Sequence, residues 1–371
     1  MVDLVSQYEN IKVEVDAAIN EVIQGSRFIN GPAVKEFQSD LEKYLSVKHV
    51  IPCANGTDAL QIAMMALGLK QGDEVITANF TFAATVETIA FLGLVPVLVD
   101  VDADTFNIDL KEIEKAITPK TKAIIPVHLF GQCADMEKIQ MLAKKHNLYV
   151  IEDTAQAIGA DYIFSDGSKK KAGTIGNIGT TSFFPSKNLG AYGDGGALYT
   201  NDDELAKQCR MIVNHGQSVQ YHYEILGVNS RLDSIQAAIL KVKLKYLDKY
   251  AAARNKAAAY YDKAFSRETK IKTPVRAKNS SHVFHQYTLT LNGVDRNKLK
   301  EHLASKEIPA MIYYPVALHS QPAYHHKIND EKKYPVTDKL CACVISLPMH
   351  TELDDDTLKY ISDSVLEFCN K

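Results

Sequence analysis

The sequence predicts an α/β protein, with a large domain built on a mainly parallel central sheet and a smaller C-terminal α+β domain. Two observations predict this class. Between residues 49 and 152, short and almost continuous apolar runs alternate with segments of helical periodicity, as parallel strands buried on both faces require. A long helical pattern rich in Ala, Lys and Leu then covers residues 232–261 and separates this region from the C-terminal residues.

The first elements are expected in a regular order. A helix covers residues 13–23, residues 26–31 break its pattern, and Pro32 begins a second helix that ends at residue 45, because proline suits the first turn of a helix. Strands and helices then alternate. The strands are 49–53, 74–77, 95–100, 123–128 and 148–152, and the helices between them are 57–67, 82–92, 110–117 and 136–146.

The second half of the chain contains fewer regular patterns. Strands are expected at 180–184 and 197–200, on either side of a glycine-rich turn at 190–196. We expect the long helical pattern to be broken partway and to act as a hinge near Lys249. This divides the chain into domains of residues 1–249 and 250–371. Strands at 283–291 and 310–314, flanked by helices, and a final helix at 354–369 complete the smaller domain.

Composition excludes several classes of function. The 371 residues include 42 basic and 45 acidic side chains, a net charge of −3, so no basic field attracts nucleic acid or an anionic membrane. No apolar stretch approaches the roughly 20 residues that span a bilayer, and the N-terminus is unlike a signal peptide. Cys341 and Cys343 are too close for the usual zinc spacing and lie in an apolar run. We expect a cytoplasmic protein whose cysteines pack in the core.

The first candidate site is the turn at residues 54–58, between an expected strand and an expected helix. Gly56 permits close approach of the backbone, and the N–H groups at a helix start carry partial positive charge. Together these features suit a phosphate group. The alternative interpretation is an ordinary helix cap formed by Thr57 or Asp58.

The second and third candidates follow later strands. Asp153 belongs to an acidic pair at the end of an apolar strand; its carboxylate could cap a helix, bind a metal, or hold a proton on a heterocyclic nitrogen. Lys187 follows another apolar strand, among serines and before the glycine-rich turn. A desolvated lysine becomes a nucleophile suited to Schiff-base chemistry, whereas most lysines are solvated surface residues. Asn229 and Arg231 precede the long helix, where they could simply cap it and carry an exposed charge.

The combination favours one cofactor. A phosphate site at a helix start, an acid at a strand end and a later lysine are what pyridoxal phosphate (PLP) requires, because the acid keeps the pyridine nitrogen protonated. An aromatic ring must also cover the cofactor. Phe82 is available at another strand-to-helix junction, although it could instead pack in the core.

These segments resemble the DegT-type sugar aminotransferases of the aspartate-aminotransferase fold, which is fold type I of the PLP enzymes. The matching segments extend over essentially the whole chain: CANGTDAL, NFTFAATVE, VHLFGQCADM, VIEDTAQAIGA, SFFPSKNLGAYGDGGA, GVNSRLDSIQAAIL and YYPVALHSQPAY. The resemblance implies that Lys187 is the Schiff-base lysine and that Asp153 is the partner of the pyridine nitrogen. It also implies Gln156 near the ring hydroxyl, with Phe82 stacked on the ring.

The resemblance further implies how the phosphate is held. Gly56, Thr57 and Ser182 would bind it within one subunit, and Asn229 would reach it from the neighbouring subunit. The active unit would therefore be a homodimer with shared active sites.

Within the family, CANGTDALQI, GQCAD and GVNSRLD are most similar to 3-aminotransferases that act on UDP-2-acetamido-2-deoxy-3-oxo-glucuronate in O-antigen synthesis. The implied reaction moves an amino group from L-glutamate, which leaves as 2-oxoglutarate, to carbon 3 of the sugar. An alternative substrate is a dTDP-3-keto-6-deoxyhexose. A PLP dehydratase would have histidine in place of Lys187, and a regulatory protein that binds PLP without turnover is a remote alternative.

Four residues are candidates to bind the substrate. Arg231 suits an anionic group, because its planar guanidinium matches a carboxylate or phosphate. Tyr313, Tyr314 and His319 could close over the sugar from the smaller domain. Arg231 and His319 could equally be exposed surface residues.

Overall fold

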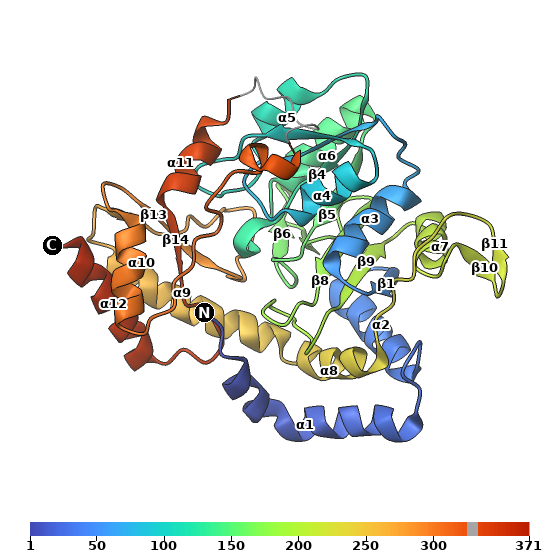
Figure 1. Cartoon of the computed structure of the whole chain (residues 1–371), viewed down its shortest axis with the longest axis horizontal. Coiled ribbons are helices and arrows are strands. Elements are labelled where there is room, and N and C mark those ends of the chain that lie inside the picture. The colour runs from blue at the N-terminus through green and yellow to red at the C-terminus, as the bar shows by residue number, and fades with distance from the viewer. Residues whose placement is uncertain (325–332, 371) are drawn as a thin grey trace.

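A seven-stranded sheet forms the centre of the large domain in a computed structural model, which describes residues 1–324 and 333–370 (Figure 1). The strand order is β1-β9-β8-β5-β4-β2-β3, and β9 alone is antiparallel to its neighbours in this sheet. The strands are β1 (His49–Cys53), β2 (Glu74–Ala78), β3 (Val95–Val99), β4 (Thr121–Ile125), β5 (Tyr149–Asp153), β8 (Ile178–Ser182) and β9 (Gly196–Thr200). The predicted mainly parallel sheet is confirmed.

Both faces of this sheet are buried, which explains the continuous apolar runs. Val150 of β5 packs toward one layer of helices, and the next residue, Ile151, packs toward the other, because side chains alternate along a strand. One layer contains α3 (Gly56–Ala66), α4 (Ala84–Phe91) and α7 (Asp203–Ile212). The opposite layer contains α2 (Pro32–Leu45), α5 (Leu110–Ala116), α6 (Met136–His146) and α8 (Ser234–Leu244).

The C-terminal residues form a smaller antiparallel sheet with its own core. Its strands are β12 (Ile271–Lys272), β13 (Tyr287–Leu291) and β14 (Val344–Leu347). The end of α9 (Leu247–Phe265), α10 (Arg296–Ser305) and α12 (Asp355–Cys369) pack on it. The remaining helix, α11 (Pro335–Cys343), joins this unit to the large domain, since the Asp100 carboxylate accepts hydrogen bonds from the N–H groups of Val336 and Thr337 at 2.9 and 2.8 Å.

Several local expectations are corrected. The long helical pattern is broken at Lys245 and Tyr246, between α8 and α9, whereas the boundary expected near Lys249 falls inside α9 and stays a prediction. The strand expected at 310–314 is wrong, because Met311 forms only an isolated bridge there. The strand expected at 123–128 ends at residue 125, before Pro126, which has no N–H to donate.

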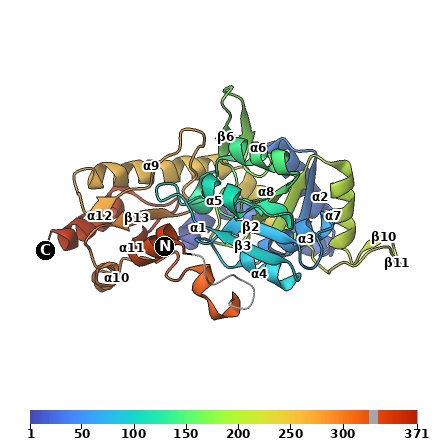
Figure 2. The same cartoon turned by 90° about the horizontal axis from the view of Figure 1, so that it is seen from above.

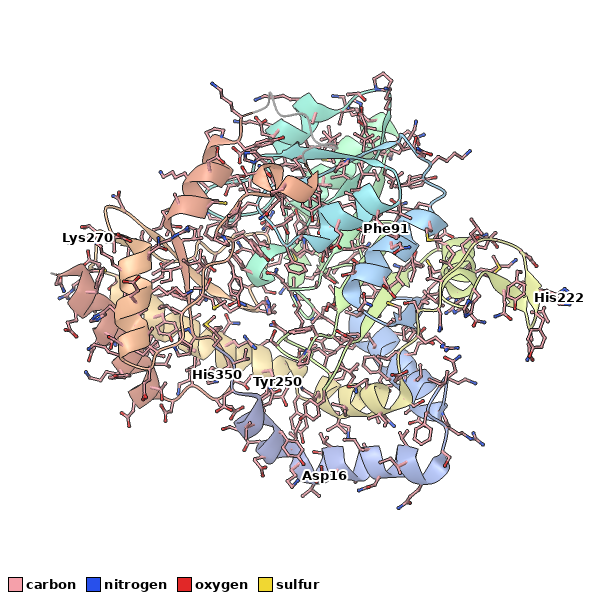
Figure 3. The ribbon with its side chains drawn as sticks, viewed as in Figure 1. Asp16, Phe91, His222, Tyr250, Lys270 and His350 are labelled. Atoms are coloured by element: carbon pink, nitrogen blue, oxygen red, sulfur yellow. The ribbon has the colours of Figure 1, made fainter. Side chains whose placement is uncertain are left out.

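Some elements lie at the periphery. Helix α1 (Leu4–Gly25) runs beneath α8, and its Gln7 side chain donates a 3.2 Å hydrogen bond to Thr351 near the C-terminus (Figure 1). The hairpin β6–β7 (Asp161–Ile163 and Lys169–Lys171) projects from the large domain (Figure 2). The hairpin β10–β11 (Gln217–Val219 and His222–Tyr223) projects beyond α7, with His222 near its tip (Figure 3).

Short 3-10 turns occur at η1 (Leu129–Gly131), η2 (Leu318–Ser320) and η3 (Pro322–Tyr324). None of the helices in the described part of the chain is long and apolar enough to cross a membrane. All six cysteines are free; Cys341 is buried as expected, and Cys343 is half-buried.

Candidate active site

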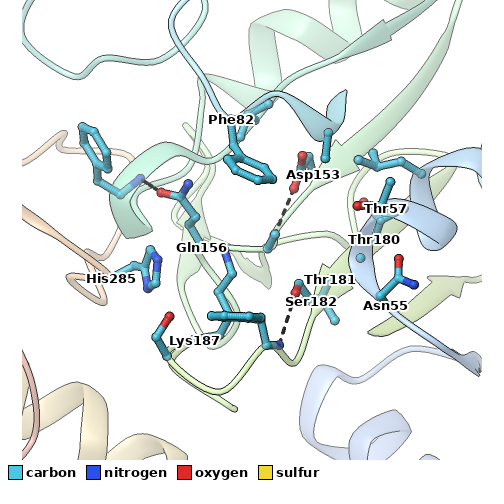
Figure 4. A pocket seen from close by; sticks show the side chains of 18 of the residues that line it. Asn55, Thr57, Phe82, Asp153, Gln156, Thr180, Thr181, Ser182, Lys187 and His285 are labelled. Atoms are coloured by element: carbon cyan, nitrogen blue, oxygen red, sulfur yellow. Dashed lines mark hydrogen bonds between the residues drawn. The ribbon is translucent and has the colours of Figure 1, made fainter. Parts of the chain in front are cut away.

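A cavity of about 420 Å³ lies at the carboxyl edge of the parallel strands, between the large domain and the segments that precede β13 and α11 (Figure 4). Ligands bind at this edge in open α/β folds. Most residues predicted from the sequence line this one cavity: Gly56, Thr57, Phe82, Asp153, Gln156, Ser182, Lys187, Tyr313 and Tyr314.

The turn before α3 forms one end of the cavity. Asn55 caps the helix, because its side-chain oxygen accepts a 2.8 Å hydrogen bond from the Asp58 N–H; a cap by Thr57 or Asp58 is therefore wrong. Within the described residues, no acceptor is bonded to the N–H groups of Gly56 and Thr57. A Cβ atom on Gly56 would lie only 2.7 Å from that of Ser182. Glycine thus brings the helix start directly against the end of β8.

Asp153 ends β5 with its carboxylate in the cavity wall. The side chain is only 6% exposed, and one oxygen accepts a 2.9 Å hydrogen bond from the Thr85 hydroxyl. The other oxygen accepts a 3.1 Å bond from the Ala155 N–H. Two bonds leave capacity on a carboxylate, which can accept about four. Asp153 therefore keeps an oxygen lone pair available for a ligand.

Lys187 lies in the loop after β8, and its side chain points into the cavity (Figure 4). The loop is fixed, since the Lys187 N–H donates to the Phe184 carbonyl at 2.8 Å and the Asn188 amide donates to the Val283 carbonyl at 2.9 Å. Burial lowers the pKa of Lys187 to about 8, and the negative charge of Asp153 opposes that shift. The neutral, nucleophilic amine is therefore accessible near physiological pH.

Gln156 and the aromatic residues enclose the cavity between these groups. The Gln156 amide accepts a 2.8 Å bond from the Phe130 N–H and donates a 3.0 Å bond to the Tyr314 hydroxyl. Phe82 lines the cavity while 57% of its surface is exposed, so the core-packing alternative for it is wrong. Burial raises the pKa of Tyr313 and of Tyr314, and both phenols stay protonated donors.

Three predicted residues lie outside this cavity. Asn229 is exposed, in an isolated bridge with Asn214. Arg231 lines a separate hollow beneath the β10–β11 hairpin. His319 is bound to Asn79, with 2.8 Å between the Asn79 amide nitrogen and His319 Nδ1. Their roles toward a cofactor or substrate stay predictions, and within one protomer the structure does not bring them to Lys187.

The structure also adds residues that sequence reasoning missed. The Thr85 hydroxyl donates a hydrogen bond to Asp153. Thr85 belongs to the NFTFAATVE segment but is not among the site residues predicted from the sequence. Asp194, in the glycine-rich turn, is exposed at the cavity. His285 is buried in the cavity wall just before β13. No sequence pattern marked His285, because its segment meets the large domain only through the tertiary fold.

The residues present fit the predicted cofactor. The free N–H groups and the close approach at Gly56 suit a phosphate. At the other end of the cavity, a lysine with a lowered pKa and a buried carboxylate share the wall, as a pyridinium ring bearing an aldehyde requires. The searched residues contain no group of three or more His, Cys, Asp or Glu that could hold a metal. The metal-ligand interpretation of Asp153 therefore has no support in the described part of the chain.

Comparison with known proteins identifies the family of the chain. A family model described as the DegT/DnrJ/EryC1/StrS aminotransferase family matches residues 9–366. The UDP-2-acetamido-2-deoxy-3-oxo-D-glucuronate aminotransferase of Pseudomonas aeruginosa is 47% identical over 361 residues, 97% of each chain. A "pleiotropic regulatory protein" of Geobacillus stearothermophilus is also 47% identical, over 99% of this chain and 98% of its own. The dTDP-3-amino-3,4,6-trideoxy-alpha-D-glucose transaminase of Streptomyces venezuelae is 37% identical, over 100% and 96%.

Solved structures show the same fold. The crystal structure of S. venezuelae DesV superposes with a TM-score of 0.95 at 37% identity and covers 100% of this chain and 98% of its own. The NtdA protein of Bacillus subtilis, solved with the bound cofactor PMP, superposes with a TM-score of 0.90 at 32% identity. That match covers 98% of this chain and 82% of NtdA.

Proposed function

The chain belongs to the DegT/DnrJ/EryC1/StrS aminotransferase family, whose members are PLP-dependent sugar aminotransferases, and from this premise we propose its substrates. L-Glutamate donates the amino group and leaves as 2-oxoglutarate. The acceptor is carbon 3 of a 3-keto nucleotide sugar, namely UDP-2-acetamido-2-deoxy-3-oxo-glucuronate, for synthesis of a surface polysaccharide such as O-antigen. A cytoplasmic location stays a prediction.

We assign a role to each residue that would hold the cofactor. PLP, when bound, supplies an electron sink that stabilises the charge left after an α-hydrogen departs as a proton. The N–H groups of Gly56 and Thr57, with the Ser182 hydroxyl, would hold its phosphate. Asp153 would keep a proton on the ring nitrogen, because an opposite charge in a partly desolvated site favours the protonated form.

Lys187 is the residue that moves the proton. Its amine has a pKa lowered to about 8, close to working pH, as an efficient general base and acid requires. It can therefore take the proton from the α-carbon of glutamate and later deliver a proton to carbon 3 of the sugar. Phe82 and Tyr314, with ring centroids 6.5 Å apart, form an aromatic part of the cavity wall beside this transfer.

One observation carries the choice of sugar: the near full-length 47% identity with the P. aeruginosa glucuronate aminotransferase. The dTDP-sugar alternative is supported by the S. venezuelae transaminase, at 37%. Among the described residues that line the cavity, Lys187 is the only lysine or arginine. We therefore look for the cations that a uronate carboxylate and a diphosphate require outside this described lining.

We assign those cations to a second copy of the chain. Asn229 and Arg231 lie outside the cavity of their own protomer. Ser230 between them is held firmly, since it donates a 2.6 Å hydrogen bond to Asp58 and accepts a 3.0 Å bond from the Ala54 N–H. We propose a homodimer in which Asn229 of the partner subunit reaches the phosphate and Arg231 of the partner subunit reads the substrate's anionic group.

The test is a substrate panel. Purified enzyme is incubated with glutamate and either UDP-2-acetamido-2-deoxy-3-oxo-glucuronate, its analogue without the carboxylate, or a dTDP-3-keto-6-deoxyhexose, and the aminated product is identified by mass. We expect the uronate to give the highest kcat/KM. Faster amination of the dTDP sugar would replace this assignment with its alternative.

Arg231→Ala sharpens the panel. If Arg231 binds the carboxylate, the variant should raise KM for the uronate roughly 10- to 100-fold, the worth of one charge-assisted pair, and leave the 6-deoxy sugar nearly unchanged. Equal losses on both sugars would assign Arg231 to the diphosphate. Arg210→Ala, which removes an exposed arginine from α7, is the matched control and should have no effect.

The name of the Geobacillus relative is the reason to test the remote alternative, a regulatory protein that binds PLP without turnover. A purely regulatory protein would bind PLP yet convert none of the panel. Turnover of any one sugar with glutamate excludes it.

A further inference from the structure

His285 is a buried part of the cavity wall that the assigned roles do not use. It lies just before β13, is 7% exposed, and lines the cavity with Lys187 (Figure 4). Figure 4 shows its ring beside the Lys187 side chain and near Gln156. A histidine in that place lies beside the lysine that carries out the transfer.

The segment that bears His285 is held rigidly. The Val283 N–H donates to the Gly131 carbonyl at 2.9 Å, and the Val283 carbonyl accepts the Asn188 amide at 2.9 Å. Asn188 is the residue next to Lys187 in the chain. The Asn188 side chain therefore ties the segment that bears His285 to the loop that bears Lys187.

The His285 Nδ1 atom is buried without any hydrogen-bond partner. The Lys187 amine is a donor without a partner, because no acceptor among the described residues is bonded to it. Besides burial, the charge of Asp153 is what shifts its pKa. A buried polar atom without a partner is unfavourable and rare in folded proteins. The wall of one cavity thus contains a buried acceptor and a donor that are both unused.

We propose that His285 is a positioning residue for Lys187. In this structure the two atoms are not bonded to each other; a rotation of the lysine side chain brings its amine to Nδ1, which then accepts a hydrogen bond from it and directs the nitrogen lone pair at the proton on the α-carbon of glutamate. The proton moves from that carbon to Lys187 Nζ, and the imidazole itself stays neutral. This role depends on the family's activity and goes beyond the choice of sugar.

The surrounding charges agree with a neutral acceptor. Burial, followed by the charges of Lys187 and Arg254, holds the pKa of His285 well below its usual range. The other titratable groups that line the cavity are Asp153, Asp194, Tyr313 and Tyr314. With the proton on Nε2, the buried Nδ1 is an acceptor at every working pH.

The first test uses protein without cofactor. Acetylation of Lys187 by acetic anhydride is followed by mass spectrometry between about pH 6 and 10, which gives the pKa of its amine. Loss of an acceptor destabilises the ammonium form more than the amine, so His285→Leu should lower this pKa by roughly half to one unit. His285→Asn, whose amide can replace Nδ1, should restore it, whereas His285→Gln should not.

The control is His282→Asn, in a neighbouring histidine whose Nδ1 is already bonded to the Phe284 N–H at 3.0 Å. It should leave the pKa of Lys187 unchanged. If His285→Leu fails to fold, the Asn and Gln variants decide the matter. Equal pKa values for Lys187 in wild type and in every folded His285 variant would overturn the proposal.

The second test follows the single half-reaction of PLP-loaded enzyme with glutamate alone in a stopped-flow spectrometer. His285→Leu should lower the limiting rate of this half-reaction roughly 10- to 100-fold with little change in the glutamate concentration that gives half of that rate, and should raise the isotope effect of α-deuterated glutamate because proton transfer becomes limiting. A weaker apparent affinity for glutamate with an unchanged limiting rate would overturn the proposal. Neither test uses a sugar, so failure of the sugar assignment cannot be confused with failure of this one.

Discussion

The cavity and the packed interior each contain a lysine with a lowered pKa and a buried carboxylate. At the cavity these are the half-buried Lys187 and the buried Asp153; in the packed interior they are the fully buried Lys243 of α8 and Glu152 of β5. Burial lowers the pKa of both lysines to about 8. By that measure alone, the two regions are alike.

Their partners differ. The Glu152 carboxylate is fully bonded to His128 at 2.9 Å and to three backbone N–H groups of residues 173–176, and the Lys243 ammonium lies over the Tyr192 ring at 5.1 Å. In the cavity, the lysine amine and one carboxylate lone pair face open space. A perturbed pKa therefore identifies a buried group, and only unused hydrogen-bonding capacity beside a cavity identifies a site.

The largest expected change in rate distinguishes the two lysines. Lys187→Ala should lower the transamination rate by at least about 10⁴-fold, since it removes the residue that moves the proton, while the melting temperature stays close to wild type. Lys243→Met, the matched control, should retain full turnover. Activity is measured as 2-oxoglutarate release. Comparable losses in both variants would mean that burial, rather than the cavity, explains Lys187.

The next largest effects are expected at the adjacent carboxylates Asp153 and Glu152, on the rate and on stability respectively. Asp153→Asn should keep the fold and lower the rate by roughly 10²- to 10³-fold, because the ring nitrogen loses its charged partner. Glu152→Gln should instead destabilise the protein by about 2–4 kcal/mol, since an amide NH₂ would face the N–H donors that Glu152 accepts. Rates and urea unfolding are measured for both variants. A near-normal rate in Asp153→Asn would place the nitrogen's partner elsewhere.

A smaller effect tests whether the cavity is complete within one protomer. Lys187→Ala and Asn229→Ala subunits, inactive alone, are mixed under conditions that allow exchange. If the homodimer shares its sites, random exchange restores about one quarter of wild-type activity, because half the dimers are mixed and each has one intact site. Mass-tagged subunits confirm the exchange. No recovery after demonstrated exchange would show that Asn229 acts within its own chain.

The sequence predicts the parts of this molecule that depend on local order. Apolar runs fix the strands, so the sequence places Asp153 at the end of β5 and Lys187 in the loop after β8, and the glycine at position 56 indicates the turn that begins α3. The capping residue was missed by two or three positions, since Asn55 and its neighbours Thr57 and Asp58 are all good caps.

Other parts depend on contacts that no local pattern contains. His285 reaches the cavity because residues 283–286 pair with the η1 turn, a contact between segments far apart in the sequence. The strand expected at 310–314 failed for a related reason: Tyr313 and Tyr314 line the cavity and leave Met311 alone to pair with β14. Residues that serve a site through tertiary contact give no periodic signal.

The smallest effect concerns the stability of the packed region. Burial, reinforced by the charge of Arg254, lowers the pKa of Lys243 from 10.5 to about 8. Below pH 8 the folded protein therefore holds a desolvated charge, and between pH 8 and 10.5 the unfolded chain binds more protons, so wild-type stability from this group rises with pH. Lys243→Met removes that charge. After allowance for the lost contact with Tyr192, it should stabilise the fold by roughly 2 kcal/mol at neutral pH.

The advantage of Lys243→Met should shrink as the pH rises toward 10.5, where the wild-type lysine is neutral in both states. Urea unfolding at about pH 7 and about pH 9.5 measures the difference between the two proteins. The titration of Lys187 is common to both and cancels. A variant that is less stable at neutral pH, or a difference independent of pH, would mean that the Tyr192 contact outweighs the desolvation of Lys243. The packed lysine would then be a stabilising group in its own right, and the two regions would differ in energy as well as in partners.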